Sequence, residues 1–142
     1  MRIYLDNCCF NRPFDDQTQI KIRLETEAKL FIQKEILNGK YDLAWSYILE
    51  YENQMNPFKE RKEVISEWKS IAVVDLEETN DILKFAEVLE DKGIKTKDAL
   101  YISCAIEARC YYFLTTDKKL LNSEVEEIKI INPIEFINEM EG

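Results

Sequence analysis

The feature that most constrains the fold of this chain is an alternation of short β-prone runs with longer helical patterns along its whole length. The β-prone runs number five and cover residues 2–6, 41–45, 71–76, 111–115 and 128–131. The segments between them carry apolar residues at helical spacing. Strands that alternate with helices predict a parallel sheet with helices on both faces. We therefore expect an α/β fold, a three-layer sandwich around a central, mostly parallel five-stranded sheet.

The expected helices are ended by recognisable breaks. The helical patterns cover residues 17–38, 46–55, 58–69, 79–92 and 97–109, and Pro133 opens a last short helix. Gly39 and Gly93 follow two of these patterns and are natural C-terminal stops. The chain has only three glycines and three prolines, so no flexible linker is expected. Residues 1–142 should form a single domain with a real hydrophobic core.

The composition excludes several classes of chemistry. The sequence contains no histidine, which removes His acid–base catalysis, His-dependent Ser or Cys triads and His-ligated zinc. Its formal net charge of -9 repels nucleic acid, so a polyanionic substrate needs metal ions, a local basic patch or a basic partner. The four cysteines include no CxxC pair and favour free, mostly buried thiols in a reducing compartment, with Cys8 and Cys9 packed in the core. No apolar run approaches the ~20 residues of a membrane span. We expect a soluble, cytoplasmic protein that does not contact a membrane.

Four acidic positions are expected at one edge of the sheet. Asp6 ends the first strand, and Asp117 follows the fourth. Asp98 lies in the first turn of the helix that leads into the fourth strand, and the helix after the second strand carries Glu50 and Glu52. Helices that connect parallel strands run back antiparallel to them, so all of these positions lie at the carboxyl edge. Open α/β sheets bind their ligands at that edge.

Simpler roles remain open for two of these acids. Asp98 is also a first-turn residue that the helix dipole favours. Asp117 is also suited to N-cap a short helix formed by KKLLN. Asp6 closes an apolar strand and has no local capping need, so a structural role explains it less well.

Helical phase separates Glu52 from Glu50. Glu52 shares a face with three apolar residues, Ile48, Leu49 and Met55. Glu50 groups with three polar residues, Ser46, Asn53 and Gln54. A carboxylate on an apolar face needs a reason to be buried. This favours Glu52 as the second acid and leaves Glu50 as the solvated alternative.

A cluster of carboxylates needs something to compensate its charge, because like charges in one cleft repel each other. Mg²⁺ or Mn²⁺ supplies this compensation, since a hard divalent cation prefers oxygen ligands and usually keeps water in its shell. An acid cluster without His or Cys ligands is typical of phosphoryl-transfer sites, in which metals activate water and stabilise the leaving oxygen.

Taken together, these motifs resemble the PIN-domain family of metal-dependent nucleases. The resemblance covers nearly the whole chain and is carried by IYLDNCCF around Asp6, SYILEYE around Glu52, KDALYISCA from Asp98, FLTTDKKL at Asp117 and the ending IINPIEFI. It implies a Rossmann-like parallel sheet and Mg²⁺- or Mn²⁺-dependent cleavage of single-stranded RNA, as in the toxins of VapC-type toxin–antitoxin pairs. It also implies an antitoxin partner and a homodimer.

The resemblance assigns roles to individual residues. It makes Asp6, Glu52, Asp98 and Asp117 the metal ligands, directly or through water. Thr116 matches a position whose hydroxyl orients the site, and Asn7 is a candidate second-shell donor, although it is also a typical turn residue. Five basic residues near this edge are candidates for phosphate contact, with Lys97 and Lys118 foremost: Arg12, Lys95, Lys97, Lys118 and Lys119.

Three features set the chain apart from that pattern or qualify it. Lys119 stands where many members of the family carry a further acid, so the number of metals is left open. The segment NRPFDDQ is longer than its typical counterpart. The tyrosines and phenylalanines are spaced as core and edge residues rather than as a base-stacking platform. A PIN-like interaction domain with little or no catalytic activity is therefore the alternative function.

Overall fold

A five-stranded sheet forms the centre of the computed structural model, which describes residues 1–142. The strands are β1 (Arg2–Leu5), β2 (Asp42–Ser46), β3 (Val74–Leu76), β4 (Tyr112–Leu114) and β5 (Lys129–Ile131). Their order in the sheet is β3-β2-β1-β4-β5, and every neighbouring pair is parallel. The expected α/β fold with a five-stranded parallel sheet is confirmed. The third strand is shorter than expected because Ile71 ends the preceding helix.

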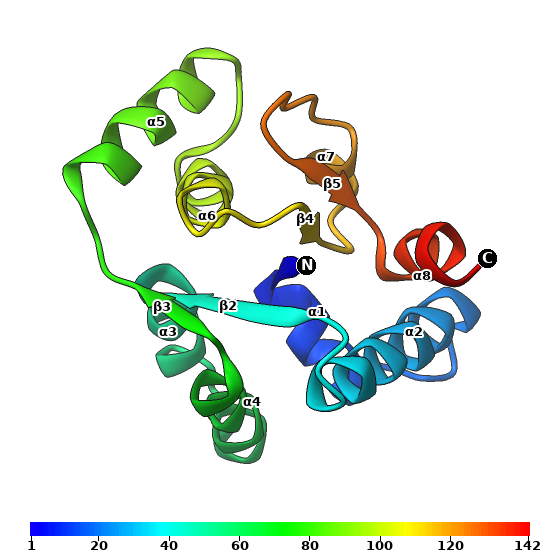
Figure 1. Cartoon of the computed structure of the whole chain (residues 1–142). Coiled ribbons are helices and arrows are strands. Elements are labelled where there is room, and N and C mark those ends of the chain that lie inside the picture. Colours follow the sequence, from blue (N-terminus) through cyan, green and yellow to red (C-terminus); the bar gives the residue numbers. More distant parts are fainter.

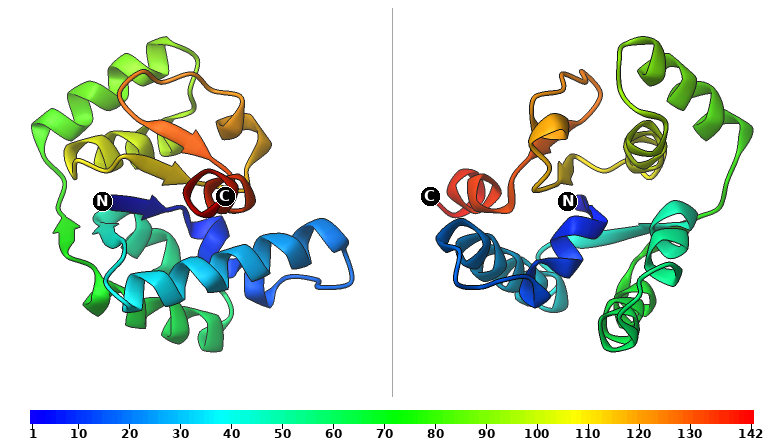
Figure 2. Two further views of the ribbon diagram at one scale, coloured as in Figure 1. Left: turned by 45° about the vertical axis from the view of Figure 1, so that its right-hand side comes forward. Right: turned by 180° about the vertical axis from the view of Figure 1, so that it is seen from behind.

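Helices cover both sides of the sheet and make the expected three layers (Figure 1). They are α1 (Asn7–Asn11), the 3-10 helix η1 (Arg12–Phe14), α2 (Ile20–Leu37), α3 (Tyr47–Gln54), α4 (Lys59–Ile71), α5 (Asn80–Asp91), α6 (Thr96–Glu107), α7 (Lys118–Leu121) and α8 (Pro133–Glu141). The pair α5 and α6 lies on one side of the sheet, whereas α1 to α4 lie on the other, with α8 beside α2 (Figure 2). None of these helices is long and apolar enough to cross a membrane.

The two glycines expected to stop helices do so. Gly39 follows α2 with φ 81°, and Gly93 follows α5 with φ 97°. Both angles fall in the left-handed region, where a residue with a Cβ is strained and glycine is not. These stops turn the chain sharply back towards β2 and α6.

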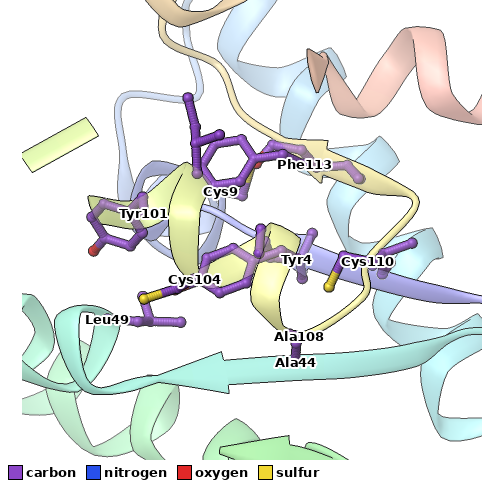
Figure 3. Packing of buried hydrophobic residues seen from close by; sticks show 14 of the residues in the cluster. Tyr4, Cys9, Ala44, Leu49, Tyr101, Cys104, Ala108, Cys110 and Phe113 are labelled. Carbon is purple, nitrogen blue, oxygen red and sulfur yellow. The ribbon is translucent and has the colours of Figure 1, made fainter. Parts of the chain in front are cut away.

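An aromatic cluster fills the core between α6 and the strands β1 and β4. The rings of Tyr4 and Phe113 stack with centroids 5.4 Å apart, and the ring of Tyr101 meets Tyr4 edge-on at 6.0 Å. Tyr4, Phe113 and Tyr101 are each 1% exposed or less. Figure 3 shows the Tyr101 ring in this cluster with its hydroxyl directed away from the cluster's centre. The core thereby fixes a hydroxyl group at its margin, where the candidate site lies.

The segment NRPFDDQ is ordered by a network around Arg12. The guanidinium of Arg12 contacts Glu25 Oε1 and Asp15 Oδ2, each at 2.9 Å. Glu25 lies on α2 and is completely buried, and Asn132 Nδ2 donates to its other oxygen at 2.6 Å. A buried carboxylate is tolerated only when its oxygens are paired in this way. The network joins the segment after α1 to α2 and to the start of α8.

Candidate active site

Asp6 and Asp117 lie at the carboxyl ends of two adjacent strands. Asp6 directly follows β1, and its backbone N–H donates to Leu114 O at the end of β4 (2.9 Å). Asp117 is the third residue after the end of β4. The chain adds β2 and β3 on one side of β1 and then returns to its other side with β4, so this is the point where strand order reverses. Ligand sites of open α/β sheets are found at such points.

Both aspartates also cap a helix. Asp6 Oδ1 accepts from Asn7 N at 2.8 Å and caps α1, and Asp117 Oδ1 accepts from Lys119 N at 2.9 Å and caps α7. The expectation that Asp6 has no local capping need was wrong, because it overlooked helix α1. For Asp117 the N-cap alternative is correct, and the same residue nevertheless lines the pocket described next. Capping and lining the pocket are therefore compatible roles.

The four expected acids line one pocket of about 210 Å³. Asp98 enters it from the first turn of α6, and Glu52 enters it from α3. The complete lining is Asp6, Asn7, Cys8, Glu52, Lys97, Asp98, Tyr101 and Asp117. Residues that are far apart in sequence thus lie in the same hollow, as the positions of their strand and helix ends predict. We call it the acid pocket.

Glu52, and not Glu50, belongs to the acid pocket. Glu52 Oε2 contacts Lys97 Nζ at 2.9 Å, and Glu52 Oε1 accepts a hydrogen bond from the Tyr101 hydroxyl. Glu50 instead accepts from Trp45 Nε1 at 3.1 Å, outside the pocket. One premise of the phase argument was wrong: Met55 is 67% exposed, whereas Asn53, assigned to the polar face, is completely buried. Contacts with α6, and not burial on an apolar face, therefore orient Glu52.

The hydroxyl that orients Asp6 belongs to Thr115. Thr115 Oγ1 donates to Asp6 Oδ2 at 2.8 Å and accepts from Asp117 N at 3.1 Å, so it links the two strand ends. Thr116 was expected to supply the hydroxyl that orients the site. Thr116 instead contacts this region through its backbone N–H, which donates to Cys8 Sγ. Alternation along an extended segment explains the difference, because neighbouring side chains point to opposite sides.

Two further neighbours of Asp6 differ from expectation. Asn7 contacts the Asp6 carboxylate through its backbone N–H and not through its side chain, whose Oδ1 accepts from Asn11 Nδ2. Cys8 was expected in the core together with Cys9, but it is only partly buried and its Sγ donates to Asp6 Oδ2 at 3.3 Å. Of these two cysteines, only Cys9 is fully buried. Helix α1, which the sequence patterns did not reveal, turns the Cys8 side chain towards the acid pocket.

Burial and mutual repulsion disfavour negative charge in this pocket. Burial raises the pKa of Asp6 well above its usual range. The pKa of Asp98 is also raised, first by burial and then by the charge of Asp117, with Glu52 adding to the effect and Lys97 opposing it. A ligand with positive charge would relieve both effects.

Of the two lysines favoured for phosphate contact, only Lys97 lines the acid pocket. Its ammonium group pairs with Glu52, which raises the pKa of Lys97, and its side chain is 60% exposed. Lys118 begins α7 and is exposed, but it does not line the pocket. Lys119 is likewise exposed and lies outside it.

The donor set suits a hard divalent cation, because the acid pocket offers carboxylate oxygens from four residues. In the present arrangement no three acidic or thiol side chains are grouped closely enough to hold a metal ion together. Glu52 is paired with Lys97 and Tyr101, and Asp6 with Thr115 and Cys8. The oxygen ligands in the pocket thus suit such a cation. For several of them to bind one ion together, side chains must move, and Glu52 must first separate from Lys97.

The charge balance predicts that Asp98→Asn stabilises the metal-free protein. The pKa of Asp98 is raised in the folded state, so its ionised form weakens folding once the pH exceeds the ordinary aspartate pKa. We expect the variant to unfold roughly 2–4 °C above wild type at pH 7 in a chelator, and the difference to shrink as the pH falls towards 4. Thermal unfolding followed by circular dichroism measures it.

Asp81→Asn is the matched control, since Asp81 is an exposed first-turn residue of α5. Its loss removes only a favourable helix-dipole interaction and should lower the midpoint slightly. A midpoint of Asp98→Asn below that of wild type at pH 7 would contradict the electrostatic description of the pocket.

Comparison with solved structures identifies the class of fold. The chain superposes on one chain of VapBC2 from Rickettsia felis with a TM-score of 0.58 at 17% identity, over 93% of this chain and 98% of that one. That VapBC2 structure is bound to a DNA fragment from the VapBC2 promoter. FitAcB from Neisseria gonorrhoeae matches with a TM-score of 0.57 at 14% identity, over 92% and 97%. DNA-bound VapBC from Salmonella typhimurium matches with a TM-score of 0.56 at 18% identity, over 94% and 98%.

These likenesses extend over nearly the whole length of both chains, so the PIN-like fold expected from the sequence is confirmed. At such low identities they concern the fold alone. No protein-family profile matches the sequence, and no curated protein matches it.

Proposed function

We propose that this protein is a divalent-metal-dependent endoribonuclease that hydrolyses phosphodiester bonds of single-stranded RNA. The observation that carries the proposal is the acid pocket, in which Asp6, Glu52, Asp98 and Asp117 meet at the point of strand reversal. The lack of histidine supports it, because acid–base cleavage by His side chains is excluded. A phosphodiester also fits the charge pattern only if cations offset the four carboxylates.

The chain's own residues have separable roles in this proposal. Asp6, Glu52, Asp98 and Asp117 would hold Mg²⁺ or Mn²⁺, which when bound activates water and stabilises the charge on the leaving oxygen. Thr115 and Tyr101 hold the carboxylates of Asp6 and Glu52 in position. Lys97 is the only cationic side chain that lines the pocket, and once separated from Glu52 it would pair with a bound phosphate.

A protein partner forms a second part of the proposal. The solved structures with this fold include VapBC assemblies, two of them bound to DNA. We infer that this chain, like VapC-type toxins, pairs with an antitoxin in the cytoplasm and forms a homodimer. The net charge of -9 favours an antitoxin whose basic segment covers the acid pocket. A small, partly basic protein encoded beside this chain would support the pairing.

The alternative is a PIN-like interaction domain without activity. It is favoured by the ion pair between Lys97 and Glu52 and by the lack of a preformed group of three metal ligands. Titration calorimetry with Mn²⁺ separates the two. A nuclease binds the metal and loses that binding in Asp6→Asn, whereas an interaction domain shows no binding that depends on these acids.

The proposed activity is tested with a labelled single-stranded RNA. Wild type is expected to cleave it with Mg²⁺ or Mn²⁺ and to stop when a chelator is added. RNA that stays intact at every metal concentration, in protein freed from any bound partner, would refute the assignment.

A further inference from the structure

A second and larger hollow of about 520 Å³ adjoins the acid pocket, between α1, α3 and the segment that leads into α4. Its characteristic side chains are three amides, two aromatic rings and a guanidinium: Asn7, Asn11, Asn56, Tyr51, Phe58 and Arg61. Asn7, Glu52 and Lys97 line both hollows, so the two are continuous. We call the second hollow the side groove.

We propose that the side groove binds the nucleotides next to the cleaved bond of a single-stranded RNA, with bases stacked on Tyr51 and Phe58. This inference rests on the proposed nuclease function and assigns the part of the substrate that lies outside the acid pocket. Because the two hollows share residues, a strand whose phosphate lies in the acid pocket passes directly into the side groove.

Two aromatic side chains of the side groove are exposed. Tyr51 is 62% exposed and Phe58 is 56% exposed. The guanidinium of Arg61 lies 4.4 Å from the centroid of the Phe58 ring and donates to Phe14 O at 2.7 Å. The Arg61 guanidinium thus packs against the Phe58 ring, and its hydrogen bond to Phe14 O fixes its position. Bases of any sequence stack on such rings, since every base has a π face.

A row of amides gives the side groove a polar wall. Asn11 Nδ2 donates to Asn7 Oδ1, and Asn56 Nδ2 donates to Asn11 Oδ1, both at 3.2 Å. Asn56 Oδ1 in turn accepts from Phe58 N at 3.1 Å. The row fixes the orientation of the Asn7 amide and leaves its Nδ2 without a partner in the chain. That donor stands where the two hollows meet and can bind a phosphate or a ribose hydroxyl.

This lining favours a nucleic acid over an apolar peptide. Only three of the ten lining residues are hydrophobic, so an apolar segment would cover amides and charges without pairing them. Lys97 and Arg61 supply positive charge within an otherwise acidic protein. Exposed aromatic rings beside local cations and amide donors are the combination that single-stranded nucleic acids use.

Binding of a fluorescein-labelled oligoribonucleotide, measured by anisotropy at low salt with Mg²⁺ present, tests the proposal. The Asp98→Asn protein serves as the background so that the RNA is not cleaved. Adding Tyr51→Ala or Phe58→Ala is expected to weaken binding about 5- to 150-fold, which corresponds to the loss of one stacked base. Tyr51→Phe should bind as the background does, because it keeps the ring.

Tyr111→Ala is the matched control, since Tyr111 is 67% exposed and precedes β4 at the opposite end of the strand. If wild type cleaves RNA but Tyr51→Ala and Phe58→Ala bind RNA as tightly as the background, the proposal for the side groove is overturned and the nuclease function stays intact. Unchanged RNA affinity together with weakened binding of a co-expressed protein partner would assign the groove to that partner and equally overturn the proposal. If wild type neither binds nor cleaves RNA, both proposals fail.

Discussion

Asp98→Asn is expected to reduce cleavage of single-stranded RNA by at least about 100-fold at saturating metal. Asp98 enters the acid pocket from α6 and is a proposed metal ligand. Loss of residues that merely support a metal ligand typically costs about 10- to 100-fold, so loss of a ligand should cost more. Initial rates with a labelled oligonucleotide measure the effect. The same variant is expected to be the more stable protein without metal, so misfolding cannot explain the loss.

Glu52 and Glu50 provide a matched pair on one helix. Glu52→Gln should lose activity, because Glu52 lines the acid pocket. Glu50→Gln should keep it, because Glu50 lies outside the pocket and a Gln still accepts from Trp45 Nε1. Equal rates in wild type, Asp98→Asn and Glu52→Gln would contradict the assignment of the acids. A loss confined to Glu50→Gln would show that the wrong glutamate was chosen.

Glu25→Ala is expected to be the most destabilising of the proposed substitutions, by about 3 kcal/mol in the free energy of unfolding. Glu25 is completely buried and pairs with Arg12 and Asn132. Its removal leaves the Arg12 guanidinium, which is 21% exposed, with Asp15 as its remaining partner. The partial exposure of Arg12 places the expected cost at the lower end of the range for buried pairs. Urea unfolding measures it.

The neighbouring Glu27→Ala is the control, because Glu27 is exposed on the same helix and Ala suits a helix at least as well. Glu25→Gln should be less damaging than Glu25→Ala, since the amide oxygen can still accept one of the two hydrogen bonds. Equal midpoints for Glu25→Ala and Glu27→Ala would contradict a structural role for the network around Arg12.

The sequence was sufficient to predict which acids come together. Asp6, Asp98 and Asp117 were placed at one edge from strand order and helix direction alone, which are topological properties that do not depend on side-chain detail. Helical phase also selected Glu52 over Glu50, and Glu52 lines the pocket, although Met55 is exposed and Asn53 is buried, contrary to the assumed faces.

Features that depend on a single turn of chain were missed. Helix α1 has only five residues, and its sequence NCCFN has no helical periodicity to detect. Without it, the capping role of Asp6 and the outward position of Cys8 could not be foreseen. The choice between Thr115 and Thr116 depended on one step of alternation in an extended segment. The exposure of Tyr51 and Phe58 depends on how α3 packs against α4, which the spacing of aromatic residues does not encode.

The chemical ends of the cleaved RNA test the central claim most directly. If the acid pocket hydrolyses the phosphodiester with metal-activated water, the products carry a 5′-phosphate and a 3′-hydroxyl, and they form only when Mg²⁺ or Mn²⁺ is present. Products that end in a 2′,3′-cyclic phosphate would contradict this account, because they arise by attack of the ribose 2′-hydroxyl and not of water. Cleavage that continues in a chelator would contradict it as well, because it proceeds without the divalent metal.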